Sequence, residues 1–122
     1  MAKKLLIIDD DTRNIFALNA TLKAKGYECD SSLDGLEGLQ KISTDAYGVV
    51  LLDMMMPDVD GYEMIPRIRA IKGAEDIPVF AVTAQAMVGD RERCLEAGAT
   101  EYIAKPIDVD RLLNLLEKYL SH

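Results

Sequence analysis

The sequence predicts an α/β fold, in which five parallel strands form a doubly wound layer with helices on both faces. Short apolar runs alternate with segments whose apolar residues recur at helical spacing, and this alternation occurs five times along the chain. Because crossovers between parallel strands are right-handed, the connecting helices cover both faces of the sheet. Ligands of such folds bind beyond the carboxyl ends of the strands.

The first repeat begins with the wholly apolar strand Leu5–Ile8. The helix that follows has three apolar residues on one face: Ile15, Leu18 and Leu22. This helix ends at Lys25-Gly26, because glycine is favoured just after a helix C-terminus. Asp11 or Thr12 is expected to cap its start, since short polar side chains accept hydrogen bonds from the first N–H groups of a helix.

The second and third repeats differ in polarity. The strand Tyr27–Ser32 is more polar, which places it at an edge, and the helix Gly35–Ile42 follows it. The strand Tyr47–Leu52 is continuously apolar, as expected of a central strand buried on both faces. Its helix spans Gly61–Ile71 and contains Pro66, which lacks a backbone N–H. We therefore expect a local kink at Pro66 or a late helix start.

The fourth and fifth repeats complete the predicted sheet. The fourth consists of the strand Pro78–Val82 and the helix Asp90–Ala97, which Gly98 closes. The fifth consists of the strand Glu101–Ala104 and the helix Val109–Leu120. Residues 1–122 are therefore expected to form one domain with no output domain after it.

Composition and charge argue against several classes of function. The chain has 21 acidic and 14 basic side chains, and its net charge of −7 disfavours direct nucleic-acid binding, which needs a basic face. No apolar run approaches the roughly 18 residues that span a bilayer, so we expect no membrane insertion and a cytoplasmic location. Cys29 and Cys94 lack metal-site spacing and are expected to be reduced and structural. His122, the only histidine, ends the chain, so no catalytic triad or zinc site is expected to use it.

Charged and hydroxyl side chains stand where the predicted strands end. Asp9 and Asp10 follow the first strand, Asp53 the third, Thr83 the fourth and Lys105 the fifth. In a parallel sheet these ends meet at one edge, where clustered carboxylates raise one another's pKa unless a cation joins them. Any one of these residues alone is readily explained as a helix cap or a surface charge. Their joint order on successive strand ends favours a shared site.

The acids at this edge suit a magnesium ion. Mg²⁺ takes oxygen ligands in a tight octahedron and keeps several waters, so one or two carboxylates and a backbone carbonyl suffice to hold it. Asp10 and Asp53 are the candidates for direct ligands, and Asp9 is expected to act through water or as a charge. The carbonyl of Met55, two residues past Asp53, is the candidate neutral ligand.

Asp53 is also the candidate nucleophile, because carboxylates attack phosphoryl centres to form aspartyl phosphates. Phosphoryl transfer places negative charge on the equatorial oxygens, which fixed positive groups stabilise. Lys105 supplies such a group. Thr83 offers a hydroxyl, and the backbone N–H groups of Thr83 and Ala84 can donate to the same oxygens. Pro106 allows a cis peptide bond that would aim Lys105 inward.

These motifs occur together over essentially the whole chain: Asp9-Asp10, Asp53 followed by Met56-Pro57-Asp58 and Asp60-Gly61, Thr83-Ala84, and Tyr102 through Lys105-Pro106. In this combination the sequence resembles a response-regulator receiver domain of two-component signalling. The resemblance implies a flavodoxin-like fold with strand order 2-1-3-4-5. Asp11 departs from the family pattern by adding a third acid to the first pair, and Pro66 departs from it in the third helix.

The resemblance also implies an activity. Asp53 would accept a phosphoryl group from the phosphohistidine of a sensor histidine kinase or a histidine phosphotransfer protein, with Mg²⁺ required. Such a domain catalyses only its own phosphorylation and dephosphorylation, so it is a signalling module and not an enzyme acting on other substrates. The resemblance leaves open a stand-alone regulator, a relay intermediate or a piece of a hybrid kinase.

A conformational switch is implied by two further matches to the family. New negative charge at Asp53 would draw Thr83 inward through a hydrogen bond, and Tyr102 would rotate into the space left behind. A downstream protein target would then bind the changed surface of the fourth helix, fifth strand and fifth helix.

Two other functions share parts of this chemistry. A phosphohydrolase of the haloacid dehalogenase type also uses a strand-end aspartate with Mg²⁺, but its signature has Thr or Val where this chain has Arg13, and the chain lacks room for a substrate cap. A flavin-binding module needs a hydroxyl- or glycine-rich phosphate loop after the first strand. Three carboxylates at that place would repel the phosphate of FMN. Turnover of a phosphate monoester would identify the hydrolase, and a bound yellow chromophore would identify the flavin protein.

Overall fold

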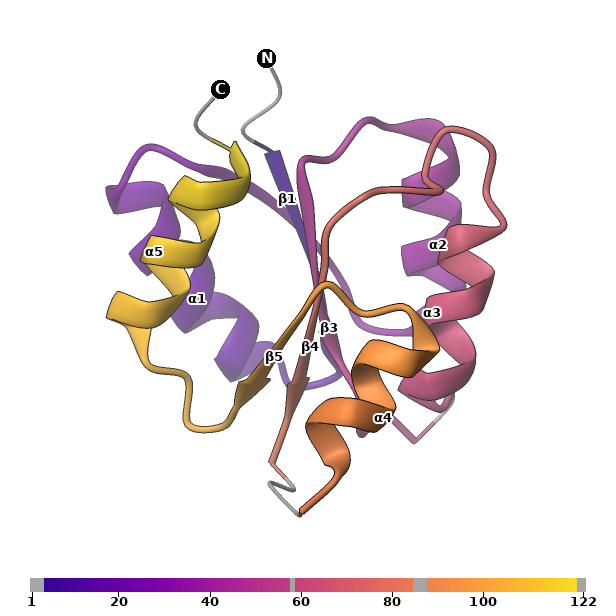
Figure 1. Cartoon of the computed structure of the whole chain (residues 1–122). Coiled ribbons are helices and arrows are strands. Elements are labelled where there is room, and N and C mark those ends of the chain that lie inside the picture. Colours follow the sequence, from indigo (N-terminus) through magenta and orange to yellow (C-terminus); the bar gives the residue numbers. More distant parts are fainter. Residues whose placement is uncertain (1–3, 58, 85–87, 121–122) are drawn as a thin grey trace.

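The computed structural model describes residues 4–57, 59–84 and 88–120, so Asp58 and His122 lie outside the described residues. Five strands and five helices alternate along the chain (Figure 1). The strands are β1 (Lys4–Ile8), β2 (Glu28–Ser32), β3 (Val49–Asp53), β4 (Val79–Thr83) and β5 (Glu101–Ala104). The helices are α1 (Thr12–Ala24), α2 (Gly35–Thr44), α3 (Gly61–Arg69), α4 (Asp90–Ala97) and α5 (Val109–Leu120).

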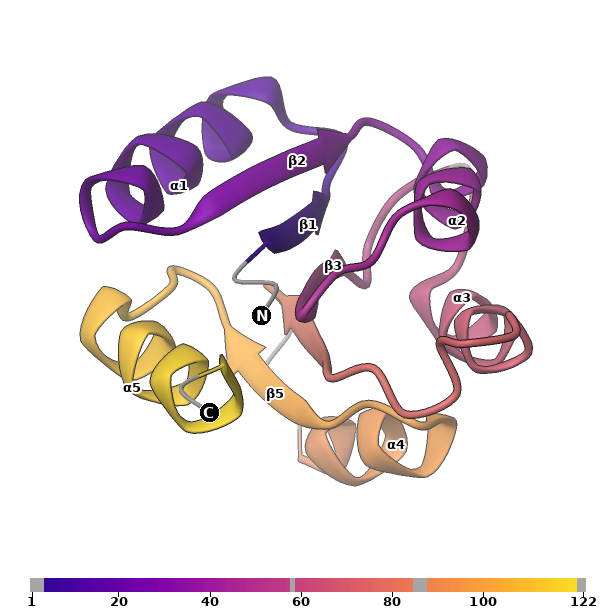
Figure 2. The ribbon, with the colours of Figure 1, turned by 90° about the horizontal axis from the view of Figure 1, so that it is seen from above.

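The strands form one parallel sheet in the order β2-β1-β3-β4-β5, which is the flavodoxin-like order predicted from the sequence. The central place of β3 and the edge place of β2 are thereby confirmed. All five residues of β3 are buried, as expected of a strand covered on both faces. In Figure 2, α1 and α5 cover one face of this sheet, whereas α2, α3 and α4 cover the other.

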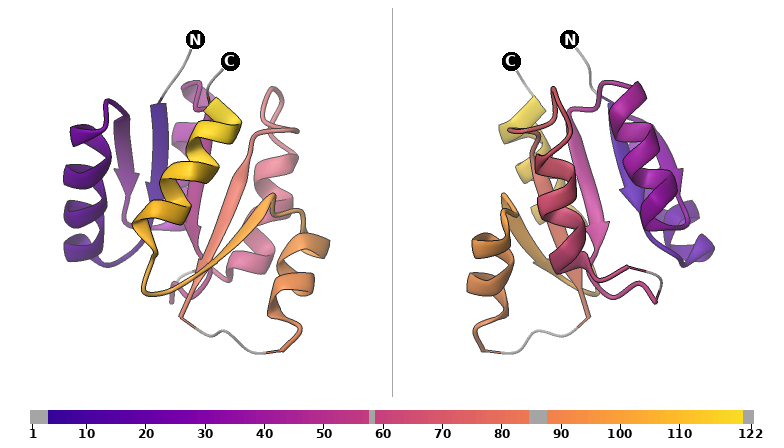
Figure 3. Two further views of the ribbon diagram at one scale, coloured as in Figure 1. Left: turned by 60° about the vertical axis from the view of Figure 1, so that its left-hand side comes forward. Right: turned by 90° about the vertical axis from the view of Figure 1, so that its right-hand side faces the viewer.

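Each face of the sheet has its own apolar core. Leu5, Ile7 and Leu51 project toward α1 and α5, where they pack with Leu22 and Leu116. The alternate strand residues project to the opposite face, because successive side chains of a strand point to opposite sides. The members of that second cluster include Leu6, Ile8, Val50, Leu52, Met64, Ile65 and Ile68. The two views of Figure 3 show the sheet held between these helical layers.

The cap predicted for the first helix is confirmed. The side chain of Asp11 accepts hydrogen bonds from the backbone N–H groups of Arg13 and Asn14 at the start of α1. Asp34 and Asp60 cap α2 and α3 in the same way. Since each of these helices follows a strand, the N-cap aspartates of α1, α2 and α3 all lie toward the carboxyl edge of the sheet.

The late start predicted for the third helix is wrong. The helix α3 begins at Gly61, directly after its cap Asp60, and runs through Pro66 to Arg69. Proline removes one backbone donor, but three residues of α3 are buried without measurable exposure and hold the helix against the sheet: Met64, Ile65 and Ile68. The kink expected at Pro66 stays a prediction.

Both cysteines are free, as expected: Cys94 is buried and Cys29 is half-buried. Burial raises the pKa of the Cys29 thiol to about 11, which keeps this thiol protonated and unreactive at neutral pH. In the described part of the chain, no helix has the length and apolar character needed to cross a membrane.

Candidate functional site

Parallel pairing brings the predicted site residues to one edge of the sheet. Ile8 of β1 pairs with Leu52 of β3, so Asp9 and Asp53 each come directly after a residue of this pair. Asp53 pairs with Val82, and Thr83 pairs with Ala104, the residue before Lys105. The register therefore aligns the ends of β1, β3, β4 and β5 side by side. The backbone N–H of Lys105 donates to the carbonyl of Thr83 at 2.8 Å, which extends the β4–β5 pairing to the lysine.

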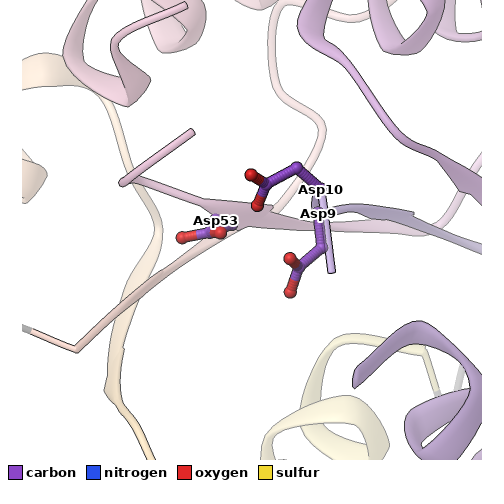
Figure 4. A group of neighbouring side chains, drawn as sticks. All are labelled: Asp9, Asp10 and Asp53. Carbon is purple, nitrogen blue, oxygen red and sulfur yellow. The ribbon is translucent and has the colours of Figure 1, made fainter. Parts of the chain in front are cut away.

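Three carboxylates converge at this edge. Oxygen atoms of Asp9, Asp10 and Asp53 lie within 4.8 Å of one another. Figure 4 shows Asp9 and Asp10 approaching from the end of β1 and Asp53 from the end of β3. Asp9 and Asp53 are buried, whereas Asp10 is exposed. The acid cluster predicted from the sequence is therefore present in the fold.

Asp9 is held in place by two hydrogen bonds from its own loop and helix. Its Oδ1 accepts from the backbone N–H of Asp11 at 2.9 Å, and its Oδ2 accepts from Nδ2 of Asn14 at 2.6 Å. Both oxygens of Asp9 are thus engaged, which suits a charge or a water-mediated ligand better than a direct one. The sequence analysis missed Asn14. Its place in the first turn after the acid pair was the available signal, because that turn lies over the end of β1.

Lys105 lies between the two buried acids. Its Nζ is 3.7 Å from Oδ2 of Asp9 and 3.7 Å from Oδ2 of Asp53. The peptide bond between Lys105 and Pro106 is cis. The ammonium group offsets part of the repulsion between the carboxylates. The lysine is half-buried, so its charge is less screened than that of a surface lysine.

Asp53 occupies the most constrained position of the cluster. It is only 5% exposed, and its Oδ1 accepts a hydrogen bond from the backbone N–H of Met55 at 3.0 Å. Burial raises the pKa of the Asp53 carboxyl above its usual value, and the neighbouring charges of Asp9 and Asp10 raise it further. The N–H of Met55 and the ammonium of Lys105 oppose this rise. An added cation beside Asp53 would favour its ionised form.

The remaining site candidates surround this centre. Thr83 is buried as the last residue of β4, and Ala84 follows it at the surface. Met55 is half-exposed in the turn after β3, beside Asp53. Tyr102 is half-buried on β5, at the margin of the core cluster beneath α2, α3 and α4. The roles of these four residues in binding a phosphoryl group, a metal or a partner stay predictions.

The donor set of this edge fits a hard divalent cation. Carboxylate oxygens are the ligands that Mg²⁺ prefers, and it needs only one or two of them because it retains several waters. Asp10 is exposed and its carboxylate has no partner among the described residues, so it can turn toward an ion. The same arrangement places the Asp53 carboxylate beside an ammonium group. Phosphoryl transfer to an aspartate requires both a carboxylate nucleophile and a nearby positive group.

Comparison with known proteins shows the family to which this chain belongs. Residues 5–117 match the response regulator receiver domain family. The chain belongs to this family. It is 35% identical over 121 residues to the polar-differentiation response regulator DivK of Brucella ovis, covering 99% of this chain and 98% of that protein. It is also 36% identical over 115 residues to the sensor histidine kinase RcsC of Salmonella typhi, covering 94% of this chain but only 12% of that kinase.

A solved structure shows the same fold in a related receiver. The receiver domain of the sensor histidine kinase PA1611 from Pseudomonas aeruginosa PAO1 has a TM-score of 0.89 and 31% sequence identity, with all of both chains covered. That receiver was crystallised with a magnesium ion coordinated in its active site cleft. The present receiver is a signalling module of two-component systems, which removes the reason to consider a phosphohydrolase or a flavin protein.

Proposed function

We propose that this receiver accepts a phosphoryl group on Asp53 from the phosphohistidine of a sensor histidine kinase or a histidine phosphotransfer protein. The observation that carries the proposal is the convergence of Asp9, Asp10 and Asp53 within 4.8 Å, with Lys105 at 3.7 Å from two of them. Family membership supports it, because the related RcsC is a sensor histidine kinase and DivK is a response regulator.

In the proposed reaction, a carboxylate oxygen of Asp53 attacks the phosphorus atom of the donor. A new O–P bond forms while the N–P bond breaks, and its electron pair returns to the imidazole nitrogen of the leaving histidine. Lys105 stabilises charge on the phosphoryl oxygens, and Thr83 and the N–H of Ala84 donate to them. The hydrogen bond from Met55 holds the nonattacking oxygen of Asp53 and so fixes the direction of attack.

A magnesium ion would be held by Asp10, Asp53 and the carbonyl of Met55, with Asp9 acting through water. When bound, Mg²⁺ supplies positive charge beside the transferring phosphoryl group. Asn14 and the N–H of Asp11 hold the orientation of the Asp9 side chain, so its oxygens stay in a fixed position relative to the other acids. The proposal therefore makes phosphorylation depend on Mg²⁺.

Phosphorylation would change the binding surface for a downstream protein target. The added charge on Asp53 would attract the hydroxyl of Thr83, which ends the neighbouring strand. Tyr102 would then turn inward on β5, and the surface of α4, β5 and α5 would change. The cytoplasmic location expected from the sequence stays a prediction.

The test is label transfer from histidine kinases encoded in the genome that encodes this chain. Each kinase is autophosphorylated with radiolabelled ATP and mixed with the receiver, with Mg²⁺ or with excess EDTA. We expect at least one kinase to label the receiver within minutes when Mg²⁺ is present and none to do so in EDTA. Labelling that is equally fast in EDTA would contradict the proposed role of the metal.

A further inference from the structure

The fourth helix is held to the sheet by few buried side chains. Of its eight residues, Asp90 and Cys94 are buried, so Cys94 is its one buried apolar side chain. By contrast, α3 buries the larger side chains of Met64, Ile65 and Ile68 against the same face. Because burial of large apolar side chains stabilises the packing of a helix on a sheet, α4 can shift at a lower cost in free energy than α3.

The two ends of α4 are anchored differently. At the C-terminal end, Nη2 of Arg69 donates to the carbonyl of Gly98, the C-cap of α4, at 2.8 Å. At the N-terminal end, the cap is Gly89, with a φ of +90° and no side-chain hydrogen bond to the first N–H groups of the helix. This end lies toward the edge of Asp53, because α4 follows β4 along the chain. A shift of α4 would therefore be largest near Asp53 and smallest near Arg69.

Two side chains of α4 contact one tyrosine in the first turn of α3. The guanidinium carbon of Arg93 lies 4.4 Å from the centre of the Tyr62 ring, within the range of a cation–π interaction. The Cys94 thiol donates a weak hydrogen bond to the Tyr62 hydroxyl at 3.8 Å. The two helices are neighbours on the sheet (Figure 2). We call Tyr62, Arg93 and Cys94 the α3–α4 latch.

The α3–α4 latch adjoins the tyrosine of the expected switch. Burial raises the pKa of the Tyr102 hydroxyl, and the nearby groups of Asp90 and Cys94 raise it further. Tyr102 of β5 therefore lies close enough to α4 to interact with both groups. An inward turn of Tyr102 would change this interaction, whereas the contacts of Cys94 and Arg93 with Tyr62 would still oppose a shift of α4.

We propose that the α3–α4 latch is an autoinhibitory contact, which holds α4 in the position of the unphosphorylated chain and opens when Asp53 is phosphorylated. The proposal rests on the proposed function and adds the contact that opposes the change in the surface of α4. The third helix is the fixed partner, because its buried side chains hold it to the sheet. Arg93 is exposed, so its guanidinium group can leave the Tyr62 ring for water when α4 shifts.

The latch should lower the affinity for any group that favours the shifted position of α4. A ligand that binds one of two conformations binds more tightly when that conformation is more populated. Loss of a contact made only in the other conformation raises this population. Removing the latch should therefore strengthen the binding of a phosphoryl analogue at Asp53, although Tyr62 and Arg93 do not touch the site.

The test measures the affinity for beryllofluoride, a noncovalent analogue of the phosphoryl group, at saturating Mg²⁺. Titrations of the unchanged chain and its variants are followed by backbone amide NMR signals. Arg93→Ala and Tyr62→Leu each remove the cation–π contact, so each should raise the apparent affinity by about two- to fivefold, the factor that such a contact is worth. Unchanged or lower affinity in both variants would overturn the proposal.

Arg91→Ala is the matched control, because Arg91 is exposed on the same helix and, among the described residues, stacks on no aromatic ring. It removes the same charge, so it should leave the affinity unchanged. Equal gains in Arg91→Ala and Arg93→Ala would assign the effect to net charge and not to the latch. Tyr62→Leu/Arg93→Ala should gain no more than Tyr62→Leu, since both substitutions remove one shared contact. Fully additive gains would contradict that shared contact.

Unfolding in urea distinguishes a latch from a contact that both conformations share. Because the latch belongs to the unphosphorylated conformation, Arg93→Ala should lower the urea midpoint without beryllofluoride and change it less when beryllofluoride is saturating. An equal loss under the two conditions would show that the contact with Tyr62 persists after α4 shifts, which would overturn the proposal.

The two proposals fail in different ways. If the unchanged chain binds beryllofluoride and Arg93→Ala binds it with the same affinity, the latch is wrong and the function of Asp53 as acceptor stands. If Asp53→Asn binds beryllofluoride as tightly as the unchanged chain, or if neither binds it, the phosphoacceptor function itself is contradicted.

Discussion

The Nζ of Lys105 lies 3.7 Å from Oδ2 of Asp53, although the two residues stand at the ends of different strands with β4 between them. The sheet brings the two residues together. The backbone N–H of Lys105 donates a hydrogen bond to the carbonyl of Thr83 in β4, and Asp53 of β3 pairs with Val82 of the same strand. The fold thereby places a cation next to a buried carboxylate without a local sequence relationship between them.

Replacing Lys105 tests the electrostatic role of this pair. In Lys105→Met the positive charge is lost while most of the side-chain volume is kept. We expect phosphorylation by phosphoramidate to slow by about a hundredfold, as when a group that stabilises transferring charge is removed. The affinity for Mg²⁺, measured by titration calorimetry, should rise, because a repelling charge beside the metal site is gone.

The matched control for this substitution is Lys72→Met, an exposed lysine in the α3–β4 connection. It changes the net charge of the chain equally. Because salt screens an exposed charge of this kind, Lys72→Met should leave both the phosphorylation rate and the Mg²⁺ affinity within about twofold of those of the unchanged protein. Equal effects of the two variants would show that long-range charge, and not the contact with Asp53, is responsible.

Asn14 is predicted to set the orientation of Asp9. The 2.6 Å hydrogen bond from its side-chain amide to Oδ2 of Asp9 is lost in Asn14→Ala. The affinity for Mg²⁺ should fall by about tenfold, which is at the low end of the loss in metal affinity seen when a residue that orients a metal ligand is removed. Asn19→Ala changes an exposed asparagine of the same helix and should have no effect. Unchanged Mg²⁺ affinity in Asn14→Ala would mean that Asp9 is positioned by the N–H of Asp11 alone.

Gly61 is predicted to be required for the turn that carries Met55. A Cβ added there would lie 2.7 Å from the Cα of Met54, which is backbone and cannot yield easily. Gly61→Ala should therefore lower the free energy of unfolding by about 1–3 kcal/mol in urea titrations.

Gly38→Ala provides the comparison for this clash. The added Cβ would meet Cδ1 of Ile8 at 2.6 Å, but that atom is the far end of a flexible side chain. We expect a smaller loss of stability in Gly38→Ala than in Gly61→Ala. The opposite ranking would show that the β3–α3 turn adapts more readily than the core around Ile8.

Asp30 is predicted to make stability depend on pH in the acidic range. Burial alone would raise the pKa of its carboxyl, but hydrogen bonds from the Tyr47 hydroxyl at 2.7 Å and from Lys4 outweigh burial and lower it. A lowered folded-state pKa stabilises the fold above the unfolded value of about 3.9, and this contribution is lost as the pH falls through the folded pKa. Because the Asp30 side chain is 36% exposed, the contribution stays below about 1 kcal/mol.

The measurement is the free energy of unfolding against pH for the unchanged chain and for Asp30→Asn. The difference between them should be largest near neutral pH. It should shrink below about pH 4, where the Asp30 carboxyl gains a proton first in the unfolded chain and, at lower pH, in the folded one. Tyr47→Phe removes one hydrogen bond without removing the charge, so it should retain part of this pH dependence. A difference that grows as the pH falls would contradict the sign of the shift.

The strand ends were predictable because each apolar run stops at a polar residue. Asp9, Asp53, Thr83 and Lys105 could therefore be assigned to one edge before the fold was known. The contact between Asn14 and Asp9 could not, because it depends on how α1 is tilted over the end of β1. The hydrogen bond between Tyr47 and Asp30 was not predictable either, because it joins segments that only the folded sheet brings together.

The bounds of the third helix were predicted less well than the strand ends. Pro66 led to the wrong expectation of a late start, because a local rule about a missing donor was weighed without the cap and the burial that surround it. Asp60 caps α3 six residues before Pro66, and the buried side chains of Ile65 and Ile68, which flank the proline, hold the helix against the sheet. Tertiary packing decided the outcome.

The most direct test of the account is the intact mass of the chain after incubation with phosphoramidate and Mg²⁺. The unchanged protein should gain one phosphoryl group, and Asp53→Asn should gain none. Asp10→Asn, which keeps the acceptor but removes a proposed metal ligand, should gain the group more slowly. Addition of a phosphoryl group to Asp53→Asn at the rate of the unchanged protein would contradict the assignment of Asp53 as the acceptor.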